Sequence, residues 1–453
     1  MSLSDRLNRS EPQTESIPYL QSDALRTIAN AIPDRLDIEQ FRAEVNEELK
    51  EQVGKSLYSG SVDPEALQAM VYRAIAVVIS RSQYPLTDSE RAELVQEIVD
   101  DILGNGPLEQ LLRDPDVTEI MVIRYDQIYQ EKHGKISLTE LAFSGEDHLR
   151  KTIDRIVGKV GRRIDESSPL VDARLRDGSR VNAVVPPIAL DGANLTIRKF
   201  FKEPFTIKDM IATGTLTDAS MRFLEAAVRG RMNVVVSGGT GSGKTTTLNV
   251  VSGFIPDDER IVTIEDSAEL QLAKPHVIRM ETRPMNIEGQ GLVTIRDLVR
   301  NSLRMRPDRI VVGEVRDGAA LDMLQAMNTG HDGSLTTVHA NSTTDALSRL
   351  ETMSLMAGMD MPMAAIREQV SRAVDLIIQQ ARLRDGSRHI TAISEVIGVE
   401  NGEIVLQDIF RFEYQQGRPD GQLGQLVATG TRPEFMDRIA QRGVRLDEAV
   451  FAA

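Results

Sequence analysis

Short, continuous apolar runs alternate with amphipathic stretches over the second half of the chain. Uninterrupted apolar runs of this length are typical of strands buried on both faces of a parallel sheet. The stretches between them repeat apolar residues every three to four positions, which is typical of helices that cover such a sheet. We therefore predict an α/β domain over residues 203–453. Its predicted strands include Val234–Val236, Ile261–Ile264 and Ile310–Val312, and its predicted helices include Lys244–Gly253, Thr294–Met305 and Asp317–Met327.

A second region of mixed pattern precedes this domain, over residues 85–202. A helix is predicted from about Asp147 to Val160, and Asp177-Gly178 and Asp191-Gly192 are turn signals between strand-like runs. These features predict a smaller, separate α/β domain. Its predicted strands are Val117–Val122, Gln127–Gln130, a segment around Arg174, Val181–Val185 and Leu195–Phe200.

The first 84 residues differ from the rest. Residues 1–35 are rich in Ser, Asn, Gln, Pro and charge and show no apolar period, so we predict a disordered tail. Apolar residues recur at helical spacing over residues 36–84, where Asp63-Pro64 marks the start of a helix that continues to about Ser80. Thr87 and Glu90 form a capping-box pattern at the start of the next domain.

The octapeptide ARLRDGSR occurs twice, at Ala173–Arg180 and at Ala381–Arg388. The flanking sequences do not match, and Asp-Gly is a frequent hairpin turn. We interpret the two copies as a coincidence of turn chemistry rather than as duplicated domains.

Composition excludes several classes of function. The chain has 453 residues, no cysteine, no tryptophan, 4% aromatic residues and a formal net charge of −15. The length predicts about two to four domains. Without cysteine there is no disulfide, no thiol catalysis and no zinc site that needs Cys ligands. The acidic balance and the scarcity of aromatic side chains disfavour a nucleic-acid-binding protein.

The same sequence gives no sign of membrane insertion. No run approaches the roughly 18 apolar residues of a membrane-spanning helix. The first 20 residues lack the apolar core of a signal peptide. We therefore expect a cytoplasmic protein that reaches a membrane only through partners.

The strongest chemical signal is a complete phosphate-binding loop, G-x-x-x-x-G-K-[ST], at Gly238–Thr245. It follows a predicted strand and precedes a predicted helix, which is the context that this motif requires. Glycines let backbone N–H groups approach phosphate, and the helix N-terminus favours negative charge. Lys244 would reach the β- and γ-phosphates, and the Thr245 hydroxyl would join the Mg²⁺ shell.

Acidic residues follow two other predicted strands. Glu314 ends the run Ile310–Gly313 in the Walker B manner, and Glu265 and Asp266 end the run Ile261–Ile264. The carboxyl ends of parallel strands meet at one edge of a sheet, where ligands of such sheets bind. Glu314 would activate the attacking water or hold Mg²⁺ through water. Spacing does not decide whether Glu314 or Glu265 is the general base, and we favour Glu314.

Histidines and arginines supply further candidates. His331 and His339 lie close together in the sequence, and a γ-phosphate sensor or subunit-contact role is favoured over a metal site or a structural role. Arg174, Arg176, Arg180 and Arg198 are candidates to stabilise transition-state charge from the preceding domain. Arg296, Arg300 and Arg304 line one face of a predicted helix, either as an inter-subunit surface or as an ordinary solvated face.

Several motifs together resemble a known family. Leu303–Asp317 (LRMRPDRIVVGEVRD) resembles the signature of the type II/type IV secretion ATPase superfamily. Leu321–Ser342 is similar to the His box of its CpaF/TadA branch, which powers tight-adherence (Tad) pili. The similarity runs from about Thr87 to the C-terminus. It also includes Gly106–Leu112, Ser167–Pro187 and Leu195–Phe200.

The resemblance implies a RecA-like P-loop ATPase domain preceded by a smaller α/β domain, assembled as a homo-hexameric ring, with ATP and Mg²⁺ as cofactors. Nucleotide would lie between the two domains near a subunit boundary. In the motifs, Glu314 matches the Walker B glutamate, Glu265 and Asp266 the Asp box, His331 and His339 the His box, and Arg180 and Arg198 the pair directed at the γ-phosphate. The nucleotide-binding residues would be Gly238, Gly239, Thr240, Gly241, Ser242, Gly243, Lys244, Thr245 and Thr246, and the metal-binding residues Thr245, Glu314 and Asp266.

The implied function is a motor that drives assembly of a Tad-type pilus, and possible retraction of it, through an inner-membrane platform protein. The absence of cysteine separates this chain from extension ATPases with a tetracysteine zinc insertion. Conjugation-type secretion ATPases are the nearest alternative. A nucleic-acid translocase and a nucleotide-dependent scaffold with negligible hydrolysis are the other two, and the intact Lys244, Thr245 and Glu314 argue against the scaffold.

Overall fold

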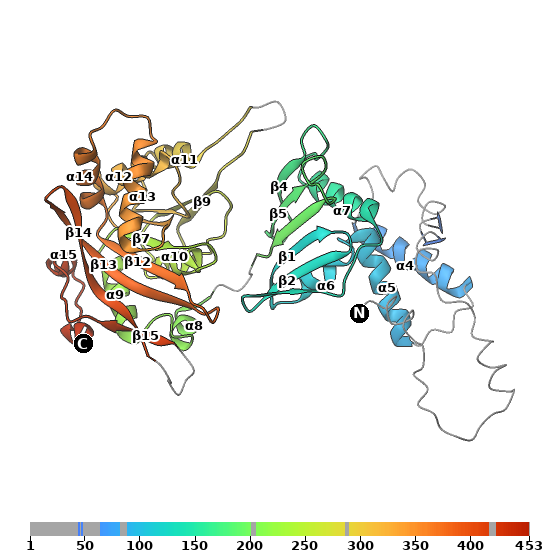
Figure 1. Ribbon diagram of the computed structural model, residues 1–453, viewed down its shortest axis with the longest axis horizontal. Helices are drawn as coiled ribbons and strands as arrows, with labels where there is room; N and C mark the ends of the chain where they lie inside the picture. Colours follow the sequence, from blue (N-terminus) through green and yellow to red (C-terminus); the bar gives the residue numbers. More distant parts are fainter. Residues whose placement is uncertain are drawn as a thin grey trace, which may run out of the picture. The chain divides into compact units, whose positions relative to one another are not determined.

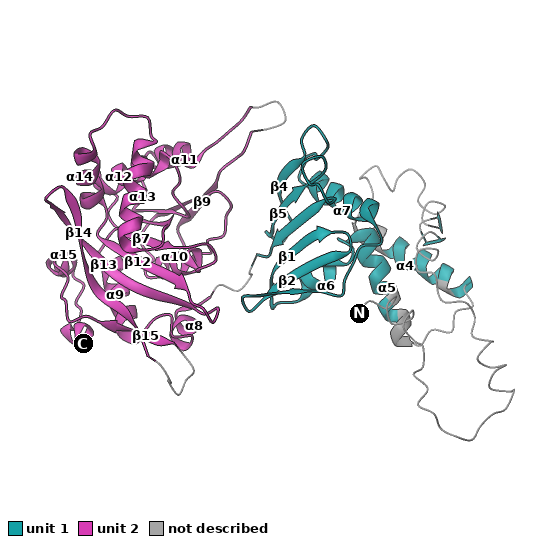
Figure 2. Cartoon of the chain, in the orientation of Figure 1, with its two compact units in different colours: residues 1–200 teal, residues 201–453 magenta. Residues whose placement is uncertain are grey.

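The computed structural model divides into two compact units, residues 1–200 and 201–453 (Figure 2). The predicted tail at residues 1–35 and the capping pattern at Thr87 lie outside the described residues. In the described ranges, no helix is long and apolar enough to cross a membrane. Those ranges are 44–45, 47–48, 64–81, 88–200, 205–285, 290–415 and 423–452.

Two helices described in the first unit share a small core. Helix α4 (Pro64–Arg81) starts at the predicted proline, and helix α5 (Asp88–Leu103) follows (Figure 1). Val71 and Ile75 of α4 and Ile98 of α5 are buried in one apolar cluster. This cluster confirms the apolar helical spacing predicted for residues 64–80.

A six-stranded antiparallel sheet forms the rest of the first unit, in the order β3-β2-β1-β6-β5-β4. Helix α6 (Leu108–Arg113) precedes the sheet, and Leu149, Ile153 and Ile156 of α7 (Glu146–Lys159) are buried in its core. The strands are β1 (Val117–Arg124), β2 (Gln127–Lys132), β3 (Lys135–Leu138), β4 (Leu170–Arg174), β5 (Arg180–Val184) and β6 (Asn194–Arg198).

A nine-stranded mixed sheet forms the centre of the second unit, in the order β15-β14-β13-β12-β7-β11-β10-β8-β9. From β12 to β9 all neighbours are parallel, and β13, β14 and β15 extend the sheet with antiparallel pairs. Strand β7, which carries the phosphate loop, lies between β12 and β11. The strands are β7 (Val234–Gly238), β8 (Ile261–Glu265), β9 (Val277–Glu281), β10 (Arg309–Val312), β11 (Leu335–His339), β12 (Leu376–Arg382), β13 (Arg388–Glu400), β14 (Glu403–Tyr414) and β15 (Gly424–Ala428).

Successive side chains of a strand point to opposite faces, and in β7 both faces are buried. Val234 and Val236 belong to one core, with helices α9 and α10, whereas Val235 belongs to another, with helices α11 to α14. The predicted two-sided covering of a parallel sheet is therefore confirmed (Figure 1). The helices are α8 (Ile207–Ala212), α9 (Asp218–Arg229), α10 (Lys244–Ser252), α11 (Ile295–Ser302), α12 (Ala319–Asn328), α13 (Thr343–Leu355), α14 (Met363–Ala373), α15 (Met436–Gln441) and the 3₁₀ helix η2 (Glu448–Phe451).

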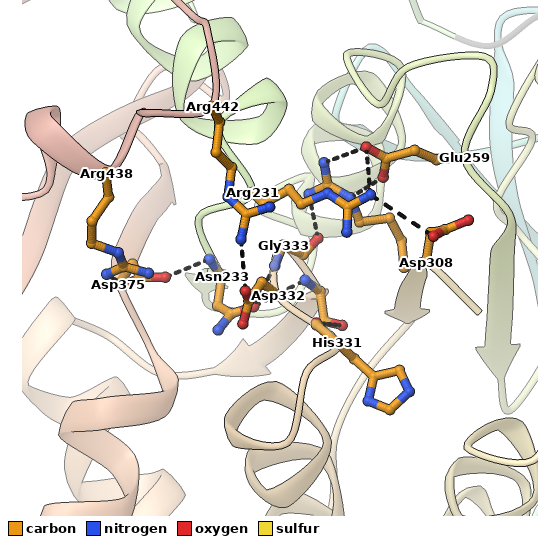
Figure 3. Close-up of polar contacts among 12 residues, drawn as sticks. Arg231, Asn233, Glu259, Asp308, His331, Asp332, Gly333, Asp375, Arg438 and Arg442 are labelled. Atoms are coloured by element: carbon orange, nitrogen blue, oxygen red, sulfur yellow. Dashed lines mark hydrogen bonds and ion pairs between the residues drawn. The ribbon is translucent and has the colours of Figure 1, made fainter. Parts of the chain in front are cut away.

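A polar network lies where the parallel strands begin (Figure 3). The Arg309 guanidinium at the start of β10 is fully buried and forms an ion pair with Glu259. It also donates to the carbonyls of Gly333, at 3.0 Å, and Val228, at 2.9 Å. A Cβ on Gly333, whose φ is +81°, would lie 1.6 Å from Arg309 Nη1, so only glycine fits there. These bonds satisfy a charge whose burial would otherwise be costly.

The arginine row on α11 has a structural role that neither sequence-based alternative anticipated. Arg296 Nε lies 2.6 Å from Asp322 Oδ2, and Arg300 Nε lies 2.8 Å from Asp322 Oδ1. Asp322 is a buried residue of α12. Two members of the row therefore hold α11 against α12.

Candidate nucleotide-binding site

The phosphate loop joins the end of β7 to the start of α10, as the motif predicts. Gly241 and Gly243 have φ values of +69° and +98°, a conformation that favours glycine. A Cβ on Gly238 would lie 2.3 Å from the Gln380 carbonyl oxygen. The loop therefore depends on its glycines for its turns and for close packing against β12.

Lys244 and the start of α10 supply hydrogen-bond donors that can bind an anion. Lys244 is buried, and its Nζ donates to the Gly239 carbonyl at 2.9 Å. The N-cap of α10 is Gly243, which has no side chain to occupy the first backbone N–H groups of the helix. Thr245 in the first turn is partly exposed and Thr246 is exposed. These groups fit the phosphates of a nucleotide.

His339 connects Lys244 to the Walker B glutamate. It ends β11 directly beside Gly238 of β7. His339 Nδ1 lies 3.3 Å from Lys244 Nζ, and its Nε2 lies 3.3 Å from Glu314 Oε1. Because an ammonium group can only donate, Nδ1 must accept and the proton of the neutral ring is on Nε2, facing Glu314. Burial lowers the pKa of His339, and the cations Lys244, Arg316 and Arg349 add to this against the opposing effect of Glu314.

Arg316 joins two of the predicted acidic residues. Its Nη2 lies 3.0 Å from Glu314 Oε2, and its Nη1 lies 3.2 Å from Asp266 Oδ2. The bond to Glu314 is the main cause of a raised pKa at Arg316. Sequence reasoning missed Arg316 as a site residue, although its position two residues after Glu314 was a usable signal.

Glu265, the other candidate base, is buried, unlike Glu314. The residue is 2% exposed, and its Oε2 accepts from the backbone N–H groups of Glu269 at 2.7 Å and Leu270 at 2.9 Å. Burial raises its pKa, against the opposing effect of these two bonds. Glu265 therefore anchors the segment that follows β8, whereas the Glu314 carboxylate is more accessible.

The structure does not bring His331, predicted as a γ-phosphate sensor or a subunit contact, to the phosphate loop of its own chain. His331 precedes β11, whereas His339 ends it. Gly333 N and Ser334 N donate to Asn233 Oδ1, just ahead of β7, at 2.7 and 3.0 Å. His331 thus lies at the edge where the parallel strands begin (Figure 3). The phosphate loop follows the other end of β7. A subunit contact is the alternative that this position still allows.

Arg180 and Arg198 lie in the first unit. They are direct cross-strand neighbours on β5 and β6, and Arg174 on β4 is the next partner of Arg180. Arg198 Nε lies 3.4 Å from Glu119 Oε1. The two arginines chosen from the sequence are therefore adjacent on one sheet.

Thr245, Glu314 and Asp266 are the residues that the sequence predicts to bind Mg²⁺. This cation prefers oxygen ligands and usually retains water and phosphate oxygens. Thr245, Glu314 and Asp266 would hold it by a hydroxyl and two carboxylates. The described residues contain no group of three or more His, Cys, Asp or Glu side chains able to hold a metal alone.

Comparisons with known proteins show the family of the chain. The sequence model of the family described as "Type II/IV secretion system protein" matches residues 101–407. A Mycobacterium tuberculosis protein named for conjugal transfer is 36% identical over 315 residues, which are 68% of this chain and 89% of that protein. The type IV secretion system protein VirB11 of Bartonella quintana is 30% identical over 328 residues, covering 63% of this chain and 90% of that protein.

Among solved structures, the VirB11 ATPase of Brucella suis is 30% identical, with a TM-score of 0.36, over 64% of this chain and 92% of that one. The family model alone spans more than half of the chain. The chain therefore belongs to the type II/IV secretion system protein family and is an ATP-hydrolysing enzyme.

Proposed function

We propose that this protein is a Mg²⁺-dependent, homo-hexameric motor ATPase. It would drive assembly of a Tad-type pilus through an inner-membrane platform protein, at the cytoplasmic face of that membrane. The observation that supports hydrolysis most directly is the set of contacts that runs from Lys244 through His339 to Glu314 and on through Arg316 to Asp266.

In this proposal each side chain has one task. Lys244 exchanges the Gly239 carbonyl for phosphate oxygens when nucleotide binds. Glu314 accepts a proton from the attacking water, and neutral His339 orients the carboxylate by donating from Nε2. Mg²⁺, when bound, would neutralise charge on the β- and γ-phosphates.

Two substitutions test the hydrolytic assignment. Lys244→Ala should abolish nucleotide binding, because it removes the buried cation of the phosphate loop. Glu314→Gln should leave the Kd for Mg-ATP within about threefold and lower kcat by at least about 100-fold, the lower range for loss of a general base. Asp437→Asn, at an acidic residue of α15 whose side chain is 85% exposed, is the control. If Glu314→Gln retained near wild-type turnover, Glu265 would become the candidate base.

A conjugation-type secretion ATPase is the second candidate, because one matched relative is named for conjugal transfer and another for a type IV secretion system. The two candidates differ in the process that fails when turnover stops. The Glu314→Gln allele in the source organism should abolish surface pili if the motor serves a Tad system. Loss of conjugal DNA transfer with normal piliation would favour the second candidate.

A further inference from the structure

The repeated octapeptide forms the same hairpin in both units. Leu175 N donates to Ser179 O at 2.9 Å in the first copy, and Leu383 N donates to Ser387 O at 2.8 Å in the second. An Asp side chain caps each turn from the equivalent position. Each hairpin also pairs two arginines directly across its strands, so both guanidinium stems start from one face. The pairs are Arg174 with Arg180 and Arg382 with Arg388.

In the second copy this face lies against the phosphate loop. Arg388 Nε donates to the Gly241 carbonyl at 2.9 Å. Arg382 Nη1 lies 3.9 Å from the position that a Cβ would take on Gly241. The Arg388 backbone is itself fixed, because Thr215 Oγ1 donates to its carbonyl at 2.8 Å.

A second contact from the same hairpin fixes the far side of the loop. Gln380, a buried residue of β12, accepts from Thr247 Oγ1 of α10 at 2.7 Å. Gln380 is also the register partner of Gly238, the first residue of the loop. The hairpin therefore contacts the loop at its start, at its middle and at the helix that follows it.

The contact at Gly241 has a geometric consequence for phosphate binding. A trans peptide directs its C=O and the following N–H in opposite directions. When Arg388 holds the Gly241 carbonyl toward the hairpin, the Ser242 N–H points to the inside of the loop. There it donates to Gly239 O over a long distance of 3.4 Å. A phosphate oxygen in the loop would be a better acceptor for it.

We propose that Arg388 is a positioning residue of the nucleotide site, which acts through the Gly241 carbonyl to hold the phosphate loop open for the phosphates of a nucleoside triphosphate. The effect of Arg388 on turnover rests on the proposed ATPase function. The contact between the hairpin and the phosphate loop does not depend on that function.

Hydrogen–deuterium exchange of the nucleotide-free full-length protein tests the contact directly. Arg388→Ala should raise exchange in peptides that cover residues 238–246, because the loop loses its bond to the hairpin. Arg388→Lys should do the same, since lysine keeps the charge but has no Nε–H at that position. Arg384→Ala, at an exposed arginine of the same turn, is the matched control and should leave exchange unchanged.

Nucleotide affinity then tests the consequence. Both Arg388 variants should weaken binding of a fluorescent ATP analogue about tenfold, the loss expected for one hydrogen bond from a charged donor. Unchanged loop exchange in Arg388→Ala, or full rescue of affinity by Arg388→Lys, would overturn the positioning role. If the wild-type protein bound no ATP, the proposed function would be wrong. The exchange data would still show whether Arg388 holds the phosphate loop.

Discussion

At the scale of single residues, the state of the His339 ring is set by its two neighbours. Lys244 requires an acceptor at Nδ1, and Glu314 accepts from Nε2. Only the neutral ring satisfies both contacts, because the imidazolium ion has no acceptor. Burial lowers the pKa of His339 and so favours the neutral ring, with Lys244 adding to this effect and Glu314 opposing it.

This arrangement predicts an acid limb in the pH dependence of turnover. Above the ordinary histidine pKa of 6.5, His339 is neutral and kcat should not depend on it. As the pH falls below that value and through the lowered pKa, the protonated ring would oppose Lys244 and turnover should fall. In the same window the unfolded chain binds a proton before the folded chain does, so acidification also lowers the free energy of unfolding.

The pH profile of kcat for His339→Asn separates this effect from other titrations. The amide oxygen can accept from Lys244 but the side chain does not titrate, so the acid limb should flatten. Its kcat should be about 10- to 100-fold lower at neutral pH, as expected for a weakened hydrogen bond to the glutamate. His276→Asn, at a histidine that contacts Arg260, is the control. An unchanged acid limb in His339→Asn would contradict the role assigned to this ring.

At the scale of helices and strands, Asp322 determines how α11 is held. Its buried carboxylate binds Arg296 and Arg300, which are partly exposed. Asp322→Ala leaves two arginines with no acceptor at this point, and water compensates them only in part. We expect the free energy of unfolding to fall by about 2 kcal/mol, below the range for fully buried pairs. Urea denaturation followed by circular dichroism measures this change.

Arg304 is the natural control for that substitution. It continues the same row on the sequence but lies beyond the end of α11, and Asp322 is already bound by the other two arginines. Arg304→Ala should therefore change stability by less than about 0.5 kcal/mol, as for most surface positions. Equal losses in the two variants would mean that the row acts as a general charged surface.

Sequence patterns predicted some elements well and others poorly, for physical reasons. Strands β7, β8 and β10 were predicted because three residues of each are Val or Ile, as expected for burial on two faces. Strand β11 (LTTVH) is equally buried, but its two threonines interrupt the apolar run, so the sequence did not predict it. Without that strand, nothing indicated that His331 and His339 lie at opposite edges of the sheet.

Contacts between distant segments were harder still to predict. The phosphate loop and Glu314 were predicted because each belongs to a short, contiguous sequence motif. Arg388 contacts Gly241 across 147 positions of sequence, through the pairing of β12 with β7. The repeated octapeptide predicted a hairpin in each place, and no local signal indicated which surface each hairpin would meet.

At the scale of the whole molecule, the two units have separate cores. The main core of the first unit contains only residues 108–197, and both cores of the second contain only residues beyond 200. Substitutions on the surface of one unit should therefore leave the folding of the other unchanged. This independence allows the arginines of the first unit to be tested for a role in hydrolysis.

We propose that Arg180 and Arg198 stabilise the charge on the γ-phosphate during hydrolysis. The double variant Arg180→Ala/Arg198→Ala should then lower kcat by about 10³-fold, the lower range for arginines in this role, with little change in the Kd for Mg-ATP. Arg176→Ala, at an exposed arginine of the β4–β5 turn, should retain wild-type turnover and serves as the control. An unchanged kcat in the double variant would show that these two arginines take no part in hydrolysis.

Mixing inactive variants tests whether these arginines act on the nucleotide of another subunit. The Glu314→Gln protein keeps its arginines and the double arginine variant keeps Glu314, so each supplies what the other lacks. In a closed ring with one repeated interface, random mixing would give about a quarter of the sites both intact parts. Turnover should then reappear on mixing, at a mass consistent with a hexamer. If each subunit used its own arginines, no mixture would recover activity, because every subunit would still carry one defective part.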